Sequence, residues 1–488
     1  MFSVSHIGAE DEHGWIVQKY GGTSVGSASR MNQIVGIIKE NLNHSHIAVV
    51  CSAMSPTEKK KGTTSMLLAA LNGVNDRTEY KGFVDKIRKY HVDEATMALD
   101  SNFQLKKEAL DYIHSNCNKL SEFLDALDII SEISPLSKDV VVSFGERLSC
   151  KLLSLVLQKN DIPSVYIGLE SLIDRPMKSQ LPLLNQQFYD KTSKKMAELM
   201  FDKITDAGYP KIKVVPVVTG YFGFVPGSLL SAIGRGYSDL SAALLSAGIL
   251  AEELQIWKEV DGIFTADPRK IKNATLINEI SPDEAAELTY YGSEVIHPFT
   301  MDQAIRNAIP IRIKNTFNPL GSGTVIVPSG SPSSPIVHKQ GPTAVTIKDN
   351  IILINVRSNL KSSAHGFLSK IFHILDSHRV TVDLISISQI NVTLAIPEDV
   401  ELDLSKVILE LEILGQTTVA HKQCILSVVG KQMRRNIGIA CQMFNSLAQS
   451  NTNIEMISQG ASEINISCVI HDIDAIKALQ ATHELIRQ

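Results

Sequence analysis

The sequence predicts an α/β protein in which a three-layer domain with an open, mainly parallel sheet is followed by a duplicated βαββ-type module. Between residues 15 and 327, short apolar runs alternate with amphipathic helical stretches, which supports the first part. The runs are apolar on consecutive residues, as expected of strands covered on both faces. A set of residues that recurs after residue 366 supports the second part. With 488 residues, the chain is also too long for one ordinary core.

The apolar runs that we expect to form the parallel sheet are rich in Val and Ile. They are Trp15–Tyr20, Ile47–Ser52, Val140–Ser143, Ser164–Ile167, Lys213–Thr219, Leu254–Lys258 and Ile311–Lys314. Helices are expected between them. The clearest helix places apolar residues on one face at alternating spacings of three and four, namely Leu110, Ile113, Cys117, Leu120, Leu124 and Leu127.

Composition indicates a soluble globular protein, with 44% hydrophobic and 20% charged residues. The net charge of −5 gives no reason to expect nucleic acid or an anionic membrane as partner. The six cysteines are scattered without a C-x-x-C pair, which argues against a disulfide framework and a zinc site and favours a reducing compartment. Residues Met1–Gly14 lack the apolar core of a signal peptide, and no apolar run approaches the ~18 residues of a membrane span. We therefore expect a cytoplasmic protein.

The C-terminal part of the chain repeats itself after Pro328–Pro335, whose composition is that of a linker. Similar residues occur at equal distances along the chain after Gly366 and after Gly438. The first copy has Phe372, Leu375, Asp383, Ile385 and Ser386, and the second has Phe444, Leu447, Glu455, Ile457 and Ser458. Two copies indicate a duplicated module, not a solenoid. The repeat by itself leaves open whether the pair is a dimerisation scaffold or a ligand sensor.

The first segment with candidate chemistry is Lys19-Tyr-Gly-Gly-Thr-Ser24, which follows the first predicted strand. Paired glycines let a backbone come close to phosphate oxygens, and Lys19 could neutralise phosphate charge. Gly21 and Gly26 have the glycine spacing of a P-loop, but Ser27-Ala28 stands where Lys-[Ser/Thr] belongs, so a Walker A site is rejected. The alternative is a plain tight turn.

Three further segments carry polar residues near predicted strands. Gly234-Arg-Gly-Tyr-Ser-Asp239 exposes Arg235 between two glycines, where its guanidinium suits a carboxylate or phosphate, although Ser238 or Asp239 could simply cap a helix. Trp257–Arg269 contains a D-G turn at a strand end, the edge where open α/β sheets bind ligands. Ser143–Arg147 is interpreted as following a strand, and its Glu146 could hold an ammonium group or be a first-turn charge.

Taken together, these segments resemble the aspartate kinases of the amino acid kinase superfamily, in the monofunctional, fungal-type branch. The resemblance covers almost the whole chain. Its strongest signatures are Lys19–Ser24, Gly234–Asp239, Val260–Arg269 and Gly292–Pro298. It implies the amino acid kinase fold followed by two ferredoxin-like βαββαβ ACT domains. The implied boundaries are a tail at 1–14, the catalytic domain at 15–327, a linker at 328–342, and ACT domains at 343–421 and 422–488, which interleaving could alter.

The resemblance implies a reaction of ATP and magnesium with L-aspartate, which gives ADP and 4-phospho-L-aspartate. The residues implied for the transferring phosphates and ATP are Lys19, Gly21, Gly22, Thr23 and Ser24. Those implied for aspartate are Ser52, Thr64, Glu146 (amino group), Arg235 (α-carboxylate) and Ser238. Asp239 is expected to organise the lysine and, indirectly, the magnesium. Those implied for the nucleotide are Lys258, Glu259, Phe264 and Arg269.

The family comparison also implies feedback control by an end product, threonine in the fungal-type branch, and a homo-oligomer built through the ACT domains. The effector positions implied in the first copy are Gly366, Phe367, Leu368, Asp383, Ser388 and Gln389. Two positions depart from the common bacterial pattern. Lys258-Glu259 stands where Thr-Asp is usual, and Glu294 replaces a lysine, so Glu294 is not assigned to ATP.

Three alternatives remain at this level. The chain could be an amino acid kinase for glutamate, carbamate or UMP, but those relatives lack the ACT pair. It could be a catalytically silent amino-acid sensor, against which Lys19, Arg235 and Asp239 argue. A fusion to homoserine dehydrogenase would need a further domain of ~300 residues, for which 488 residues leave no room.

Overall fold

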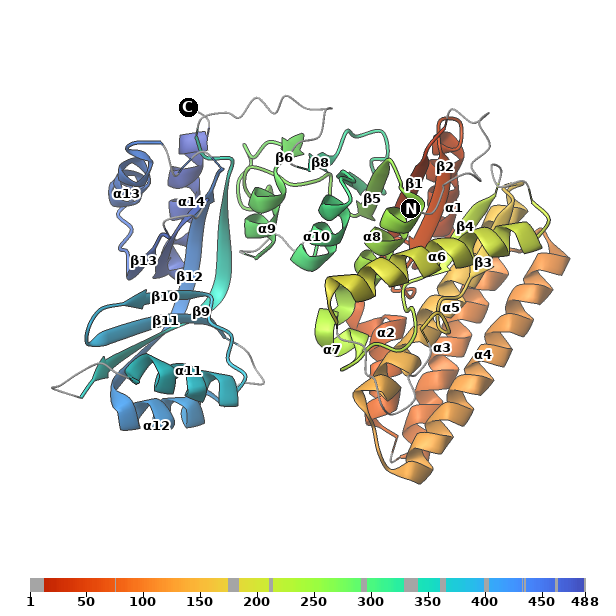
Figure 1. The fold of residues 1–488 in the computed structure, drawn as a ribbon, viewed down its shortest axis with the longest axis horizontal. Coiled ribbons are helices and arrows are strands. Elements are labelled where there is room, and N and C mark those ends of the chain that lie inside the picture. Colours follow the sequence, from red (N-terminus) through yellow and green to blue (C-terminus); the bar gives the residue numbers. More distant parts are fainter. Residues whose placement is uncertain are drawn as a thin grey trace. The chain divides into compact units, whose positions relative to one another are not determined.

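A computed structural model describes most of the chain (Figure 1). The described residues are 13–74, 76–173, 184–209, 214–290, 296–328, 341–359, 366–398, 403–431, 433, 436–460 and 464–486, without the side chains of Lys59, Ala232, Ile233 and Arg235. The chain divides into two compact units. Unit 1 comprises Met1–Gly262 and Ile296–Pro332, and unit 2 comprises Ile263–Val295 and Ser333–Gln488. The predicted linker Pro328–Pro335 lies, after Pro328, outside the described residues.

Unit 1 contains a mainly parallel sheet with the strand order β3-β4-β2-β1-β5-β7-β8. All neighbouring pairs are parallel except β7 and β8. The strands are β1 (Trp15–Tyr20), β2 (His46–Cys51), β3 (Ser164–Ile167), β4 (Val215–Thr219), β5 (Glu253–Lys258), β7 (Ile311–Asn315) and β8 (Thr324–Ile326). β2, β4 and most of β1 and β5 are buried along their length, which agrees with their apolar sequences.

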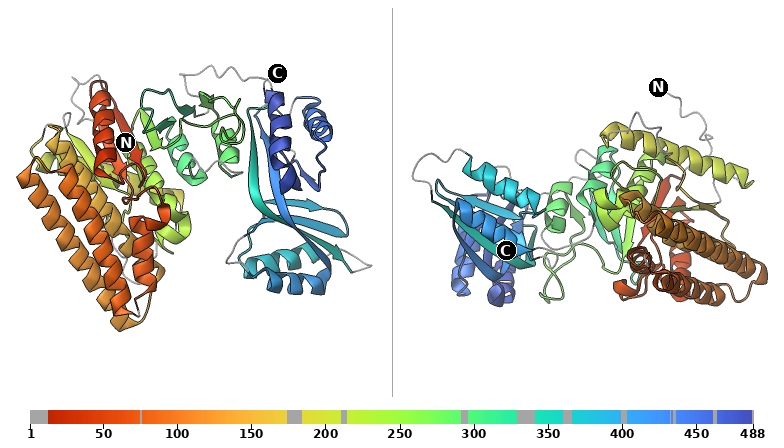
Figure 2. Two further views of the ribbon diagram at one scale, coloured as in Figure 1. Left: turned by 180° about the vertical axis from the view of Figure 1, so that it is seen from behind. Right: turned by 90° about the horizontal axis from the view of Figure 1, so that it is seen from below.

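Helices cover both faces of this sheet, which makes three layers (Figure 2). One face packs against α1 (Ala28–Asn41), α2 (Thr63–Asn72), α3 (Arg77–Ala98), α4 (Phe103–Ile130) and α5 (Pro135–Lys159). The other side carries α6 (Gln186–Asp206), α8 (Tyr237–Ile249) and α10 (Pro298–Arg306). α7 (Leu229–Ile233) and the 3-10 turn η2 (Gly234–Gly236) lead into α8. The helix predicted from the Leu110–Leu127 spacing is α4, and that prediction is confirmed.

One predicted strand is wrong. Val140–Ser143 lies inside the long helix α5, so Glu146 and Arg147 are in mid-helix and do not follow a strand. The error has a physical cause. α5 is buried on almost every side, and a helix that is apolar all round loses the 3.6-residue alternation that identifies a surface helix. The β-branched run from Val140 to Val142 then resembles a buried strand.

Unit 2 is built on two long antiparallel strands, β9 (Ala344–Ser358) and β12 (Gly415–Val429). The sheet order is β10-β11-β9-β12-β14-β13. The other strands are β10 (Leu384–Ile387), β11 (Asn391–Pro397), β13 (Met456–Ser458) and β14 (Asn465–His471). The helices are α11 (Phe367–Ser377), α12 (Leu404–Leu414), α13 (Ile439–Gln449) and α14 (Ala475–His483). A register irregularity near Gln423 divides both long strands between two halves of the sheet.

The two halves of unit 2 repeat one pattern. α11 and α12 cover one half and α13 and α14 cover the other, each with its own apolar core. Gly366 and Gly438, the origins of the sequence repeat, are the N-caps of α11 and α13, and both have left-handed backbones with φ +83° and +95°. Glycine adopts this conformation without the clash of a Cβ atom. The offsets that matched in the sequence therefore match in the fold.

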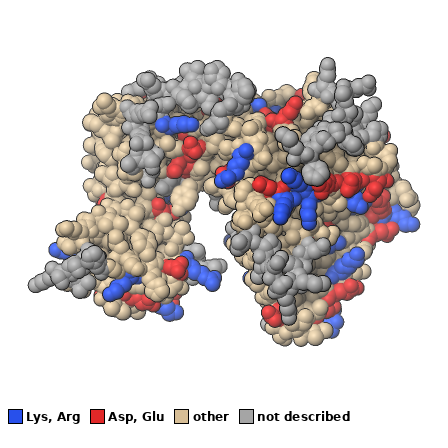
Figure 3. Space-filling model, in the orientation of Figure 1, with Lys and Arg blue, Asp and Glu red and all other residues tan. Residues whose placement is uncertain are grey.

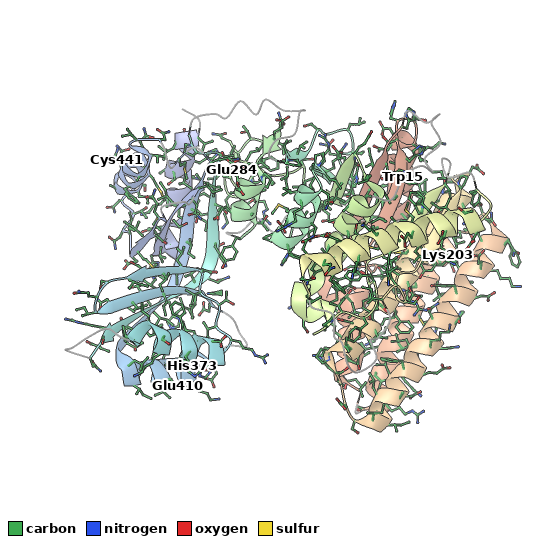
Figure 4. All side chains as sticks on the ribbon, viewed as in Figure 1. Trp15, Lys203, Glu284, His373, Glu410 and Cys441 are labelled. Carbon is green, nitrogen blue, oxygen red and sulfur yellow. The ribbon has the colours of Figure 1, made fainter. Side chains whose placement is uncertain are left out.

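Residues 263–290, which fall within the predicted catalytic domain, belong to unit 2. α9 (Pro282–Tyr290) carries Glu284, labelled in Figure 4. Its carboxylate accepts hydrogen bonds from Thr343 Oγ1 at 2.6 Å and from the Lys431 backbone at 2.9 Å. Burial acts to raise the pKa of Glu284, but hydrogen bonds from Ser281, Thr343 and Lys431 together lower it. α9 is thus held to the second half of unit 2 by a buried charge.

Charged side chains of both signs are interspersed on the visible face of unit 1 (Figure 3). Among the described residues, no helix is long and apolar enough to cross a membrane.

Candidate active site

A buried ion pair lies at the carboxyl edge of the unit 1 sheet. Lys19 on β1 pairs through its Nζ with Asp239 Oδ1 in the first turn of α8, and their side chains are only 8% and 9% exposed. β1 places Lys19 on the face that α8 covers, because side chains alternate along a strand and Tyr20 points to the opposite core. The structure therefore joins the first and second sequence motifs through Lys19 and Asp239.

The paired glycines have different surroundings. A Cβ atom at Gly22 would meet the Ala53 carbonyl oxygen at 2.3 Å, and one at Gly26 would meet the Ser55 carbonyl oxygen at 1.9 Å. Gly21 faces open space. Gly22 and Gly26 thus allow the loop after β1 to pack closely against the loop after β2, while Gly21 leaves its backbone open to a ligand.

Ser24 adds a second sign of a ligand in this loop. Its hydroxyl is buried and has no hydrogen-bond partner among the described residues. Buried polar groups are normally paired, so an unpaired one needs an explanation. A phosphate oxygen bound beside Gly21 would supply the missing partner, in agreement with the sequence prediction for this segment.

Glu146 is buried on α5, next to the Lys19–Asp239 pair. Its Oε2 accepts hydrogen bonds from the Gly220 N–H at 3.0 Å and the Tyr221 N–H at 2.8 Å. Burial raises the pKa of Glu146 to about 7, although these bonds, the Tyr237 hydroxyl and the charge of Lys19 all act to lower it. A carboxylate with so costly a charge favours a cationic partner. The ammonium group of an amino acid has that charge.

Two predicted hydroxyls meet beside this cluster. The Ser52 and Ser238 Oγ atoms are 2.8 Å apart, although they belong to the loop after β2 and to α8. The Ser52 carbonyl accepts a hydrogen bond from Ser149 at 2.8 Å, one helical turn beyond Glu146 on α5. Thr64 lies in the first turn of α2. The predicted aspartate residues Ser52, Glu146 and Ser238 thus come from three elements to one region.

The loop after β5 meets the glycine loop through one side-chain bond, in which the Thr23 hydroxyl donates to Glu259 Oε1. The Lys258 carbonyl accepts hydrogen bonds from the backbone N–H and the hydroxyl of Thr316. The Thr23–Glu259 bond brings together two of the segments predicted to face the nucleotide. In this structure the Thr23 hydroxyl donates its hydrogen bond to Glu259.

Other predicted nucleotide and substrate residues lie in unit 2 or outside the described part of the structure. Phe264 and Arg269 belong to unit 2, where Arg269 forms a two-point ion pair with Asp267 and lowers the pKa of that carboxyl. The Arg235 backbone lies in η2, and its side chain lies outside the described part of the structure, as does Glu294.

The predicted effector residues lie in the first half of unit 2. Gly366, Phe367 and Leu368 form the start of α11. Asp383 precedes β10 and forms an ion pair with Lys348 at 2.7 Å, with its own side chain only 1% exposed. Ser388 and Gln389 follow β10, and the Ser388 N–H donates to the Asn391 carbonyl at 2.8 Å.

The sequence reasoning missed residues that hold this site. The N–H groups of Gly220 and Tyr221 bind Glu146, and Asp139 on α5 binds the start of α7. Glycine at position 220 has a clear reason, because a Cβ there would lie 2.7 Å from Ser238 Cβ and 2.8 Å from Glu146 Oε1. Asp139 stands seven residues before Glu146, a spacing that places both on one helix face only if the segment is recognised as a helix.

Comparisons with known proteins indicate the family of this chain. The family model described as "Amino acid kinase family" matches residues 14–315, and an ACT domain model matches residues 426–485. The chain is 45% identical to an aspartokinase of Schizosaccharomyces pombe over 99% of this chain and 95% of that protein. It is 43% identical to an aspartokinase of Saccharomyces cerevisiae over 96% of this chain and 92% of that protein.

Solved structures of aspartokinases have a similar fold. E. coli aspartokinase III in complex with aspartate and ADP, in the R-state, matches with a TM-score of 0.72 and 26% identity over 97% of this chain and all of that one. The same E. coli protein with lysine and aspartate, in the T-state, matches with a TM-score of 0.77 and 26% identity over 96% of this chain and 98% of that one.

Proposed function

This chain belongs to the amino acid kinase family, as an aspartokinase-type phosphotransferase with a carboxyl group as acceptor, and we propose that its buried Lys19–Asp239–Glu146 cluster carries the reaction. ATP and L-aspartate give ADP and 4-phospho-L-aspartate. The cluster supports this proposal because it combines a cation suited to phosphate with a carboxylate suited to an ammonium group. Both lie at the sheet edge where α/β folds bind ligands.

Transfer of the phosphoryl group requires two anions to meet. The β-carboxylate of aspartate is already a nucleophile at neutral pH, so no general base is needed. Lys19 would stabilise the charge on the transferring group, and the open backbone at Gly21 and the Ser24 hydroxyl would bind phosphate oxygens. Positioning of this kind supplies most of the catalysis in phosphoryl transfer.

Magnesium would enter as part of the MgATP substrate, where it neutralises phosphate charge. Asp239 and Glu259 offer the oxygen ligands, direct or through water, that magnesium prefers. Asp239 also holds Lys19, so it fixes the cation beside the phosphate. Lys258, Glu259, Phe264 and Arg269 remain our candidates for the rest of the nucleotide.

Recognition of aspartate requires an anion for its ammonium group and a cation for its α-carboxylate. Glu146 would provide the first and Arg235 the second, with Ser52, Thr64 and Ser238 around them. Because Lys19 reduces the cost of the Glu146 charge, the phosphate and amino-acid subsites are electrostatically connected.

Control by threonine is proposed for unit 2, at Gly366, Phe367, Leu368, Asp383, Ser388 and Gln389. A ligand can inhibit only if it binds the less active arrangement better. We further propose a homo-oligomer through the ACT domains, catalytic and ACT boundaries near residues 327, 343 and 422, and a cytoplasmic location. The six cysteines, all free thiols in the structure, support a reducing compartment.

The test is to trap the acyl phosphate with hydroxylamine. Purified protein with MgATP should give a hydroxamate from L-aspartate and not from glutamate, asparagine or carbamate, and threonine should reduce the yield. Absence of hydroxamate from aspartate under every effector condition would refute the function. A product from glutamate instead would replace the substrate and leave the reaction class intact.

A further inference from the structure

α5 carries a second buried carboxylate, Asp139, which has no part in the reaction proposed for the Lys19–Asp239–Glu146 cluster. Asp139 and Glu146 are 3% and 2% exposed, and they lie two helical turns apart on one face. Glu146 binds the backbone of Gly220 and Tyr221, directly after β4. Asp139 binds the chain eight residues later, at the start of α7. One helix therefore holds both ends of the connection that leads from β4 to α7.

The contacts of Asp139 occupy both oxygens of its carboxylate. Oδ2 accepts from the Leu229 N–H at 2.7 Å, and Oδ1 accepts from the Leu230 N–H at 3.0 Å and from Ser228 Oγ at 2.8 Å. Helix N-termini are usually capped by the residue that precedes them. Here the negative charge at the N-terminus of α7 is that of Asp139, which lies on α5 about ninety residues earlier in the chain. Asp139 therefore attaches α7 to α5 in addition to capping it.

Ser228 shows that this attachment holds the backbone in an unfavourable conformation. It has φ +86° and ψ 133°, a region that a residue with a side chain rarely adopts. Its hydroxyl donates to Asp139 and accepts from the Ser231 N–H at 3.2 Å. Strained residues persist only where the surroundings determine them strongly, and they are concentrated at functional sites.

Ser228 is the first residue of a segment that continues through α7 and η2 to the proposed substrate residues at the start of α8. α7 runs from Leu229 to Ile233, η2 from Gly234 to Gly236, and α8 then presents Ser238 and Asp239. No other element intervenes, so the position of Ser228–Leu230 determines where the Gly234–Gly236 turn lies.

We propose that Asp139 is a positioning residue for aspartate recognition, which acts by fixing, through Ser228, the turn that carries Arg235. The proposal rests on the function proposed above, in which Arg235 binds the α-carboxylate. Asp139 itself does not touch substrate. Loosening this turn should therefore weaken aspartate binding and leave the nucleotide side of the site unaffected.

The test uses the variants Asp139→Asn and Ser228→Gly in the full-length protein. Asn keeps the shape but loses one acceptor oxygen. Gly removes the hydroxyl and accepts the positive φ without strain, so it should fold even if Asp139→Asn does not. We expect KM for aspartate to rise about tenfold in each, as for loss of a buried charge-assisted hydrogen bond, with KM for ATP and kcat within about twofold. In the double variant, the effects should be less than additive.

A second measurement does not depend on activity. Arg235–Gly236 is a site for trypsin, and its cleavage rate reports how firmly the turn is held. Cleavage there should accelerate in both variants. Asp76→Asn is the matched control, because Asp76 caps α3 through the N–H groups of Thr78 and Glu79 on the exposed surface. It should change neither KM nor the cleavage rate.

The outcomes separate the two proposals. If the unchanged protein forms no acyl phosphate from aspartate, the proposed function fails, while the trypsin rate still decides whether Asp139 holds the turn. If both variants keep KM for aspartate within twofold, or raise KM for ATP equally, the positioning role is wrong. Unchanged cleavage at Arg235 in both variants also refutes it.

Discussion

In each unit a Lys–Asp pair with a buried aspartate occurs among the described residues, and the two pairs differ in what surrounds them. Lys19–Asp239 in unit 1 is enclosed on both sides, with side chains 8% and 9% exposed. In Lys348–Asp383 of unit 2, the lysine remains 26% exposed and lies 5.1 Å from the Tyr290 ring. The first pair has Glu146 as a third charged neighbour, so its cluster carries a net negative charge if all three groups are ionised.

The difference indicates two kinds of site. If all three groups are ionised, this buried cluster would favour the entry of a cation, which supports the proposed binding of an ammonium group in unit 1. The pair in unit 2 is already neutral, and a ligand there must compete with a bond that exists. A ligand at the proposed effector site of unit 2 would therefore have to rearrange residues.

The largest expected effect comes from breaking the first pair. Lys19→Met should lower kcat at least about a thousandfold, because the cation that stabilises the transferring phosphoryl group is lost. The change also leaves Asp239 buried and unpaired, which destabilises the fold. The double variant Lys19→Met/Asp239→Asn removes that charge, and circular dichroism should show that it is folded while hydroxamate formation remains absent.

The matched control is Lys348→Met, which breaks the second pair by the same substitution. We expect turnover without threonine to stay close to that of the unchanged protein. Equal loss of activity in both lysine variants would mean that the two pairs do not differ in function.

The next effect tests the third charge of the first cluster. Glu146→Gln keeps an acceptor for the Gly220 and Tyr221 N–H groups but removes the negative charge. KM for aspartate should rise about fiftyfold, because the substrate ammonium loses its charged partner in a buried site, while KM for ATP changes little. Steady-state kinetics with each substrate varied separately measures this. A rise for ATP alone would contradict the assignment.

A smaller effect concerns the second pair. Asp383→Asn should raise the threonine concentration for half-inhibition about tenfold, because the charge that organises Lys348 and the proposed ligand site is lost. Glu455 is the equivalent position in the second copy, but it is exposed and accepts a hydrogen bond from Asn453 at 2.8 Å. Glu455→Gln should leave inhibition unchanged. The same shift in both variants would remove the distinction between the two copies.

An effect of the same size is expected for the pH dependence. Because burial raises the pKa of Glu146 to about 7, the carboxyl becomes protonated and neutral as pH falls through 7, and the ammonium group of aspartate loses its partner. KM for aspartate should therefore rise about tenfold from pH 8 to pH 6, while aspartate itself does not titrate in this range. Glu146→Gln should show a flat profile. A flat profile in the unchanged protein would show that Glu146 does not set aspartate affinity.

Much of the sheet could be predicted from local sequence. Trp15–Tyr20 and Ser164–Ile167 are strands as predicted. Leu254–Lys258 and Ile311–Lys314 differ from the observed strands by one residue at one end, and Ile47–Ser52 is shifted by one residue at both ends. β4 begins at Val215, and the start of the predicted Lys213–Thr219 strand, Lys213, lies outside the described residues. β8 was missed, because three residues are too short a run to show a period.

The site was predictable where its chemistry lies within one segment. The glycines of Lys19–Ser24 lie in one segment with the lysine, and Asp239 stands in one motif with Gly234-Arg-Gly236, although its partner Lys19 is far away in the sequence. Asp139, Gly220 and Tyr221 were not predictable in this way, since each acts on a partner far along the chain. The prediction of Val140–Ser143 as a strand added to the difficulty. Only when this segment is a helix do Asp139 and Glu146 lie on one face.

The sequence by itself determined the alternation of strands and helices, the repeat from Gly366 and Gly438, and the residue types suited to phosphate and to an amino acid. Those features depend on neighbours a few residues apart, whose spacing local geometry fixes. The tertiary structure alone decided that α5 is a helix, that Lys19 is buried against Asp239, and that Lys348 shields Asp383. Burial and charge pairing depend on which distant segments pack together, and that is a property of the whole fold.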